Sequence, residues 1–511
     1  MFQTAASLCV PQTFHSPSIF GLQTVSIQAS VVSSNVTVDI PPGGIVGQAA
    51  TNVTNLSFCN VSVATTHPGW GDLINTEVWL PLRGWNERIQ MTGGGGLATG
   101  LMAPNFAMIG AVKDDYVAVG TDGGHDSDDP GSWGLASPGN VNLYKLLDYS
   151  TPALHEAIVI GKAITNDFYG RHASFSYFVG CSTGGRQGLM YAQDFPQDFD
   201  GIIAAAPGIN YNRAILQLFY PLIRLKDYGT IPAPCELTAL TAAAVEECDP
   251  KDNVTDGIIS APELCTFDPF SLVGHRINCS GVESEISYAA AFAANETWSV
   301  TVENSTTLWL GLGHQADLSG LVNTTCDNSG HCVGVPFSPL TQWLTYFVEK
   351  DPAYDWNQFT VQDMSAFLNG PDNKLYDGFL ATNSLNLAPF AQAGGKMITY
   401  HGLADQYIPT NVSRIYYDNL LELDPDAAHY YRYYQVPGVG HCSGGAGPVP
   451  IDTIDKLVNW VEHGVAPDVL EGQSSPNAQG LVYNRPICVY PGRAVYKGQG
   501  DVTQAGNWEC K

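Results

Sequence analysis

The chain has 511 residues, and its 49 acidic residues against 22 Lys and Arg give a formal net charge of −27. So acidic a chain is a poor ligand for nucleic acid and for anionic membrane surfaces, and we expect neither as a partner. Hydrophobic residues make up 44% of the sequence, which is typical of a soluble globular protein. The length exceeds that of a usual single core and predicts two domains, or one core with a large insertion.

Twelve cysteines and ten N-glycosylation sequons predict a secreted, extracellular protein. The cysteines form no C-x-x-C pair and no cluster with zinc spacing, so disulfides in an oxidising compartment explain them better than a metal does. No apolar run approaches about 18 residues, so we expect no membrane span. The amino terminus lacks the features of a signal peptide, and we expect the chain to be a mature form. N-linked glycans are expected at Asn35, Asn52, Asn55, Asn60, Asn253, Asn278, Asn295, Asn304, Asn323 and Asn411.

The first 208 residues show an alternation of strands and helices that predicts a largely parallel α/β sheet. Apolar and β-branched residues predict strand material at 77–91, 115–120, 175–179 and 201–205. Apolar residues at helical spacing predict helices at 154–168 and 187–193.

The alternation stops between about 209 and 392, a stretch that holds six of the twelve cysteines. It resumes with strands expected at 397–400 and 430–436. We therefore expect one α/β domain, formed by residues 1–208 and 393–511, which is interrupted by an inserted lid domain at 209–392.

The segment Gly180-Cys181-Ser182-Thr183-Gly184 has the pattern G-x-S-x-G. This pattern carries meaning where a strand turns sharply into a helix, because that elbow exposes the serine hydroxyl above the sheet. A β-rich run ends at Gly180 and a helix-compatible run begins near Gly185, so Ser182 is the candidate nucleophile. The alternative is an incidental glycine-rich turn.

Two later loops supply a carboxylate and a histidine in the order that α/β-hydrolases use. Asp405 follows the strand expected at 397–400, and His441 follows the strand expected at 430–436. A serine hydroxyl needs a base within hydrogen-bond reach, and that base needs an orienting carboxylate, so these two residues complete a candidate triad. Alternatives for the base and the acid are His125, His155, His401, Asp424 and Asp426.

Cys181 directly precedes Ser182, and Cys442 directly follows His441. If these two cysteines are bridged, their Cα atoms lie about 4.4–6.8 Å apart. One covalent bond would then hold the candidate nucleophile and the candidate base close together across about half of the chain.

Negative charge that develops on a tetrahedral intermediate needs preorganised N–H donors. The residue after the nucleophile, Thr183, supplies one donor, and an earlier loop supplies the second in lipases. The glycine run 93–96 follows strand material, so either Gly94 or Gly95 is the candidate for the second donor. The alternative is that these glycines only make the loop flexible.

The segment 248–258 contains the three carboxylates of Asp249, Asp252 and Asp256. Carboxylate and backbone carbonyl oxygens are the ligands that Ca²⁺ prefers, although the spacing is not that of an EF-hand. On spacing alone, a solvated acidic turn explains these residues equally well.

Together these motifs resemble the tannase/feruloyl esterase family, whose members share Cys-Ser, Asp and His-Cys elements. The segment 180–188, G-C-S-T-G-G-R-Q-G, is a close match, as is His401-Gly402 before Asp405. The resemblance spans essentially the whole chain and implies an α/β-hydrolase fold with a large inserted lid. It also implies a structural Ca²⁺ in the lid, bound by Asp249, Asp252, the carbonyl of Val254, Asp256 and the carbonyl of Ile258. The disulfides that it implies are Cys181–Cys442, Cys248–Cys265, Cys488–Cys510, Cys9–Cys59 and Cys326–Cys332, which leaves Cys235–Cys279.

The activity that the resemblance implies is hydrolysis of gallate or hydroxycinnamate esters, either as small molecules or in the plant cell wall, by a Ser182–His441–Asp405 triad. A serine carboxypeptidase-like hydrolase shares the residue order and is one alternative. An inactive hydrolase-fold binding protein is another. Aromatic residues of the expected lid could stack on a phenolic ring, although core packing is expected for most of them: Tyr211, Phe219, Tyr220, Trp309 and Trp343.

Overall fold

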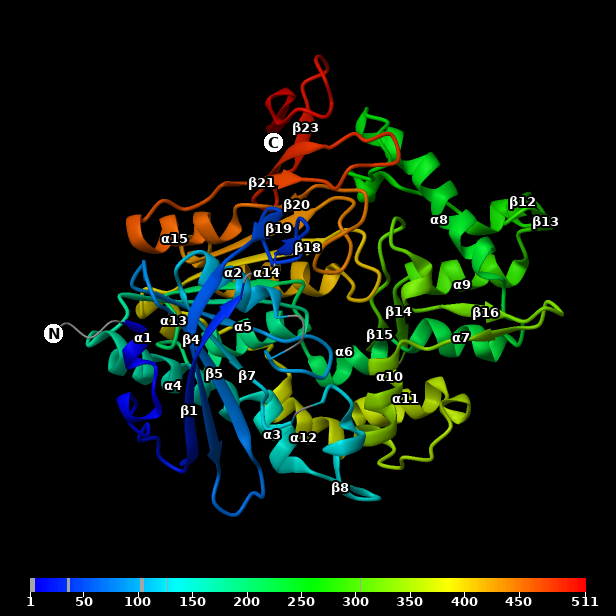
Figure 1. Cartoon of the computed structure of the whole chain (residues 1–511). Coiled ribbons are helices and arrows are strands. Elements are labelled where there is room, and N and C mark those ends of the chain that lie inside the picture. Colours follow the sequence, from blue (N-terminus) through cyan, green and yellow to red (C-terminus); the bar gives the residue numbers. More distant parts are fainter. Residues whose placement is uncertain (1–4, 35–36, 102–104, 126, 304) are drawn as a thin grey trace.

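A nine-stranded sheet forms the centre of the computed structural model, which describes residues 5–34, 37–101, 105–125, 127–303 and 305–511. Within these residues the strand order is β1-β4-β5-β7-β6-β10-β11-β18-β19 (Figure 1). The strands are β1 (Gln23–Ser34), β4 (Leu56–Thr66), β5 (Ile74–Pro81), β6 (Arg88–Thr92), β7 (Val117–Thr121), β10 (Phe175–Cys181), β11 (Gly201–Ala205), β18 (Lys396–Gly402) and β19 (Tyr431–Val436).

The expected parallel sheet is confirmed for one part of the molecule and corrected for another. The strands from β7 to β19 pair in parallel. In contrast, β1, β4 and β5 form an antiparallel extension, and β5 also pairs antiparallel with β7. The strand material expected at 77–91 is therefore two strands, β5 and β6, and β7 lies between them in the sheet.

Helices cover both faces of the sheet, as the buried character of its central strands requires. Residues of α4 (Pro152–Tyr169), α5 (Thr183–Asp194) and α14 (Asn411–Leu423) share one hydrophobic cluster with the sheet. Residues of α2 (Phe106–Lys113) and α15 (Thr453–His463) share another. These two clusters make an α/β architecture of three layers.

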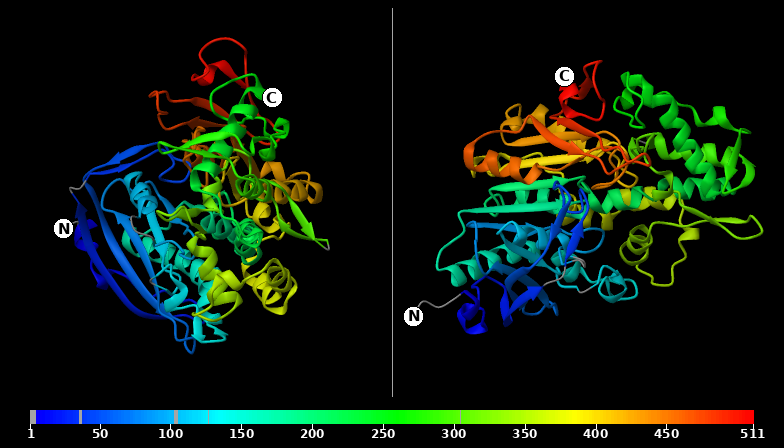
Figure 2. Two further views of the ribbon diagram at one scale, coloured as in Figure 1. Left: turned by 90° about the vertical axis from the view of Figure 1, so that its right-hand side faces the viewer. Right: turned by 45° about the horizontal axis from the view of Figure 1, so that its top comes forward.

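Between β11 and β18 the chain leaves the sheet. Most of this segment, green to yellow in Figures 1 and 2, gathers on one side of the molecule. Its last helix, α13 (Ala388–Gln392), lies beside α5 instead. The expected lid 209–392 lies within this segment, and its description as a separate domain stays a prediction. Most of its buried residues pack in one cluster with Trp133, Leu146 and Tyr149, and the last two belong to α3 (Leu143–Ser150). Ile209, Leu387 and Phe390, near its two ends, pack instead in the cluster of the sheet and α5. The longer helices of the segment are α6 (Tyr211–Gln217), α7 (Tyr220–Tyr228), α8 (Pro234–Cys248), α9 (Tyr288–Trp298), α11 (Val361–Asn369) and α12 (Pro371–Leu380).

All twelve cysteines lie among the described residues and form the six disulfides that the family resemblance implied. The bond between Cys181 and Cys442 joins the end of β10 to the loop after β19 over a sequence separation of 261. The bond between Cys326 and Cys332 closes a separation of only 6. Among the described residues, no helix combines the length and apolar character that crossing a bilayer requires.

Replacing Cys181 and Cys442 together by alanine should destabilise the protein more than replacing Cys326 and Cys332 together. The first bond closes a far longer loop of the unfolded chain, and chain entropy alone predicts a difference of about 3 kcal/mol. Calorimetric melting of both non-reduced variants measures this difference. Equal decreases in Tm would show that the longer crosslink does not constrain the unfolded chain as expected.

Candidate active site

Ser182 lies at a sharp turn between β10 and α5, and its backbone has a φ of 64°. A positive φ is strained for a residue with a side chain, so the surrounding contacts must hold it. The N–H of Ser182 donates to the carbonyl of Ala205, at the end of β11, over 3.0 Å. Small neighbours permit the turn, since a Cβ on Gly180 would lie 2.6 Å from the backbone of Gly184. The helix expected at 187–193 therefore begins earlier, at Thr183.

Asp405 and His441 follow β18 and β19, and the structure brings their side chains together. Nδ1 of His441 donates to Oδ2 of Asp405 over 2.8 Å. The Asp405 carboxylate is 1% exposed, and its Oδ1 accepts the N–H groups of Tyr407 and Ile408 over 2.8 and 2.9 Å. The histidine loop is fixed in turn because the N–H of His441 donates to Oε1 of Gln406 over 3.0 Å.

The charge on Asp405 is stabilised despite its burial. Burial by itself would raise the pKa of this carboxyl, but the nearby charge of His441 and hydrogen bonds from His401 and His441 outweigh it. The pKa therefore lies well below its usual range, and the group stays ionised. An ionised carboxylate is what a general-base histidine needs to keep its tautomer and to stabilise its positive charge.

The other histidines and aspartates considered for the triad have different partners. Nε2 of His401 lies 3.1 Å from Oδ2 of Asp405, so His401 supports the acid. Nδ1 of His155 lies 2.7 Å from Oδ2 of Asp198, and Nε2 of His125 lies 2.8 Å from the carbonyl of Leu97. The competing acids follow α14: Asp424 accepts from the hydroxyl of Tyr430, and Asp426 pairs with the exposed His429.

One cavity of about 370 Å³ contains both Ser182 and His441 in its wall, together with the disulfide between Cys181 and Cys442. The Cα atoms of these cysteines are 5.9 Å apart, within the range expected from the sequence. Cys442 has a φ of 64°, as Ser182 does, so the candidate nucleophile and the residue next to the candidate base are both held in uncommon conformations. The crosslink thus brings the two loops to one cavity.

The glycine loop 93–96 lies against the start of α5 and also lines this cavity. The N–H of Gly94 donates to Oε1 of Gln187 over 3.0 Å, so Gly94 does not fit the role of oxyanion donor. Among the described residues, no acceptor faces the N–H of Gly95 or of Thr183. These two N–H groups remain the candidate pair of donors.

The carbonyl of Gly96 holds this loop in place by accepting three hydroxyl groups. Thr183 donates over 2.6 Å, and Tyr149 and Tyr211 each donate over 2.9 Å. Sequence reasoning did not assign these roles to Tyr149, Tyr211 or Gln187. The only sequence signal was the position of Gln187 directly beyond the G-x-S-x-G motif.

The acidic segment 248–258 forms a compact loop closed by Cys248–Cys265. Oδ2 of Asp249 accepts the N–H groups of Asp256 and Gly257 over 3.0 and 2.7 Å. Oδ2 of Asp252 is buried without a described partner, and Asp256 pairs with Arg485. Burial, and then the charges of Asp249 and Asp252, raise the pKa of Asp256 to about 6, although Arg485 opposes the shift.

These features fit an oxygen-ligated divalent cation in part. Asp252 offers an unsatisfied, buried oxygen. Of the three carboxylates only that of Asp256 forms an ion pair with a described Lys or Arg, namely Arg485. The three carboxylates do not converge on one point, however. Among the described residues, the one group of three acidic or histidine side chains whose ligand atoms lie within 4.8 Å of one another is a different one, formed by His67, Asp72 and Asp148.

Comparison with known proteins places this geometry in a family. The sequence profile described as "Tannase and feruloyl esterase" matches residues 59–333 and 337–511. A probable feruloyl esterase of Arthroderma benhamiae is 33% identical over 523 residues, which cover 100% of this chain and 96% of that protein. The structure of tannin acyl hydrolase from Aspergillus niger is 25% identical, with a TM-score of 0.85 over 99% of this chain and 96% of that chain.

Feruloyl esterase B from Aspergillus oryzae is 27% identical, with a TM-score of 0.78 over 97% of each chain. These relatives are carboxylic ester hydrolases, and so is this protein. The match extends over both parts of the sheet and over the segment between them. The chain therefore belongs to the tannase and feruloyl esterase family.

Proposed function

We propose that the protein hydrolyses esters of plant phenolic acids through a Ser182–His441–Asp405 triad. The observation that carries this proposal is the 2.8 Å hydrogen bond from His441 to a buried, ionised Asp405, at a cavity that Ser182 also lines. The disulfide between Cys181 and Cys442 supports it, because it links the residues adjacent to the nucleophile and the base.

In the first half of the reaction, Oγ of Ser182 attacks the ester carbonyl while Nε2 of His441 takes the hydroxyl proton. Asp405 stabilises the resulting imidazolium, and the N–H groups of Thr183 and Gly95 donate to the oxyanion. The intermediate collapses, and His441 returns the proton to the departing alcohol. In the second half, His441 takes a proton from water, which attacks the acyl-enzyme. The intermediate then releases the aromatic acid, and His441 returns the proton to Oγ of Ser182.

The two other functions considered from the sequence have less support. An inactive binding protein would not need a complete set of nucleophile, base, acid and free N–H donors. A carboxypeptidase shares that set, but the relatives in the comparisons are named as esterases acting on feruloyl or tannin substrates. We therefore favour ester hydrolysis over both.

The segment 209–392 would act as a lid that forms the acyl pocket. Its contribution to the cavity wall is mainly apolar, and the hydroxyl of Tyr211 is already donated to Gly96. Such a wall suits a planar aromatic acid with few hydroxyl groups. The expected lid aromatics Phe219, Trp309 and Trp343 are instead buried in the core of this segment, with Tyr220. The lining residues from this segment are Tyr211, Ala214, Ile215, Leu218, Phe337, Pro339 and Leu340.

Secretion and N-glycosylation also remain proposals, and the six disulfides support the first of them. Four sequon asparagines are exposed and available to glycans: Asn52, Asn55, Asn253 and Asn278. Asn60, Asn295, Asn323 and Asn411 are half-buried. Asn35 and Asn304 lie outside the described residues.

We further propose that the loop 249–258 binds a structural Ca²⁺ through Asp249, Asp252, Asp256 and the carbonyls of Val254 and Ile258. The buried, unpartnered oxygen of Asp252 supports this proposal. Ca²⁺ would neutralise carboxylates that are crowded in one loop, and so would stabilise the segment without entering the reaction. The three carboxylates would have to move closer together on binding.

Replacing His441 by Asn should lower kcat by about 10⁴-fold or more, because the serine loses its base while binding contacts remain. The matched control is His155→Asn, which removes a histidine with the same kind of carboxylate partner, Asp198, away from the cavity. Initial rates on methyl ferulate measure both variants. Near-normal turnover by the His441 variant would rule out the proposed triad.

Methyl ferulate should be hydrolysed with a kcat/KM at least about tenfold higher than methyl gallate. Each additional phenolic hydroxyl that is buried against the apolar wall without a partner costs about 1–3 kcal/mol. The two esters share the same alcohol, so their comparison isolates the acid. A preference for gallate would contradict the assignment of the acyl pocket, and turnover of blocked peptides alone would favour the carboxypeptidase.

Adding Ca²⁺ to chelator-treated protein should raise Tm by several degrees, because saturation at about 100 times Kd contributes roughly 2.7 kcal/mol. Mg²⁺ at the same concentration should not raise the Tm. In Asp252→Ala the response to Ca²⁺ should disappear, whereas Asp268→Asn, an exposed turn carboxylate of the same segment, should keep it. An unchanged response in the Asp252 variant would place the Ca²⁺ elsewhere.

A further inference from the structure

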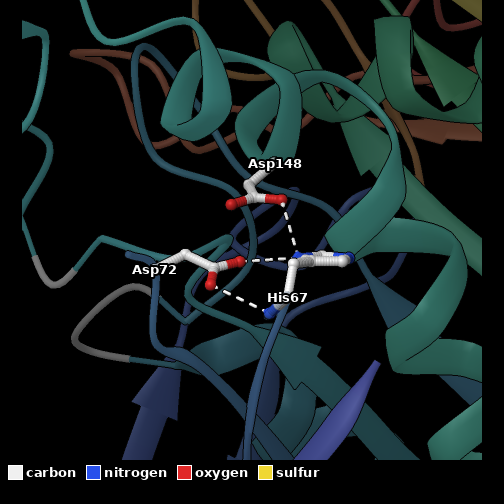
Figure 3. Close-up of side chains that lie close together, drawn as sticks. All are labelled: His67, Asp72 and Asp148. Atoms are coloured by element: carbon white, nitrogen blue, oxygen red, sulfur yellow. Dashed lines mark hydrogen bonds and ion pairs between the residues drawn. The ribbon is translucent and has the colours of Figure 1, made fainter. Parts of the chain in front are cut away.

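A second cluster of titratable side chains lies outside the cavity that contains Ser182 and His441. His67 and Asp72 belong to the turn between β4 and β5, and Asp148 belongs to α3. Figure 3 shows both carboxylates directed at the same ring nitrogen of His67. Three side chains from two distant parts of the chain thus meet at one point, where their possible ligand atoms lie within 4.8 Å of one another.

The geometry around Nδ1 of His67 is compact and shielded from water. Oδ2 of Asp72 lies 2.6 Å from this nitrogen, and Oδ1 of Asp148 lies 3.6 Å from it. Both carboxylates are 0% exposed. Neither oxygen of Asp148 accepts a hydrogen bond from a described residue, although the side chain is aimed into the cluster. A buried carboxylate without a partner is costly and calls for a compensating cation.

The protein supplies little positive charge here. Glu156 of α4 adds a third carboxylate, whose Oε1 lies 2.9 Å from Nε2 of His67. Among the described residues, none of these carboxylates forms an ion pair with Lys or Arg. One imidazole therefore faces three acidic groups.

The contacts of His67 and Asp72 with their neighbours are compatible with metal binding. A metal-binding histidine usually donates its other ring N–H to a carboxylate, which fixes the ring and the tautomer, and Glu156 occupies that position. The other oxygen of Asp72, Oδ1, accepts from the hydroxyl of Thr66 over 2.8 Å and from the N–H of His67 over 2.9 Å, and these bonds fix the carboxylate. Oδ2 of Asp72 is hydrogen-bonded to Nδ1 of His67, so an ion at this point would replace the proton between them.

We propose that Nδ1 of His67, Asp72 and Asp148 bind one divalent transition-metal ion, of which Zn²⁺ is the best match. Imidazole and carboxylate together suit Zn²⁺ at about 2.0–2.2 Å, whereas Ca²⁺ prefers oxygen alone. Binding would push Nδ1 and Oδ2 of Asp72 apart by several tenths of an ångström. The site is separate from the acidic loop 249–258 and takes no part in ester hydrolysis.

The role of such an ion would be structural. It would tie the turn between two sheet strands to α3 and, through Glu156, to α4. The residue after Asp148 is Tyr149, whose hydroxyl donates to the carbonyl of Gly96. The ion would thus stabilise the helix that supports the oxyanion loop.

The test is zinc binding by chelator-stripped protein, measured by calorimetric titration and elemental analysis with Ca²⁺ held at saturation. Wild type should bind one Zn²⁺ per chain, and Asp148→Asn should bind it at least tenfold more weakly. The matched control is Asp198→Asn, which removes the carboxylate from the neighbouring pair with His155 and should leave zinc binding unchanged. Because Asp148→Asn could fail to fold, Glu156→Gln provides a second variant, with about 10–100-fold weaker binding expected.

Cobalt substitution of wild type should also give the visible spectrum of a nitrogen- and oxygen-ligated ion. The competing explanation is a proton in place of the ion, since burial and then the charge of Asp72 raise the pKa of Asp148 to about 8. In that case wild type retains no stoichiometric zinc and gives no cobalt spectrum, and the proposal fails. Equal zinc binding by wild type, Asp148→Asn and Glu156→Gln would assign the metal to surface histidines and would also overturn it.

Discussion

The covalent link between Cys181 and Cys442 is the constraint on which the geometry of the candidate site depends. It connects the end of the central strand β10 to the loop after the edge strand β19. A residue with a φ of 64° lies at each end of the link, Ser182 next to Cys181 and Cys442 itself. Each such conformation costs about 1–3 kcal/mol and persists only where its surroundings fix it. The sheet, the glycine contacts at the start of α5 and the crosslink provide that fixation.

The residues of the proposed triad could be placed from the sequence because they follow the ends of parallel strands. Buried runs at 175–179 and 397–400 mark β10 and β18, and Ser182 and Asp405 follow the ends of these strands. The antiparallel extension was less visible. The half-exposed β1 lacks a continuous apolar run. The turn between β5 and β6 contains Gly84 and Asn86, and the expected strand material at 77–91 included it. Two strands that are consecutive in sequence are then separated by β7 in the sheet.

Other features were hidden because they depend on tertiary contacts. The first turn of α5 is rich in glycine, which has poor helix propensity. It is helical because it packs so closely against its neighbours that only small residues fit there. Which of Gly94 and Gly95 can donate to an oxyanion depends on Gln187. Its amide oxygen accepts the N–H of Gly94, and the N–H of Gly95 is left as the candidate donor. The His67 cluster joins residues that are far apart in sequence, so no motif spacing marks it.

The three hydroxyls on the Gly96 carbonyl have a consequence for how this fold can vary. Tyr149 and Thr183 come from the α/β layers, but Tyr211 comes from the segment that encloses the cavity. A change in the segment that contains Tyr211 would therefore also affect the glycine loop 93–96, which carries the proposed oxyanion donor. The Tyr211 hydroxyl thus connects the wall of the cavity to the glycine loop. We expect homologues with a different segment at this place to keep a hydroxyl donor for the Gly96 carbonyl, or to have a different loop at 93–96.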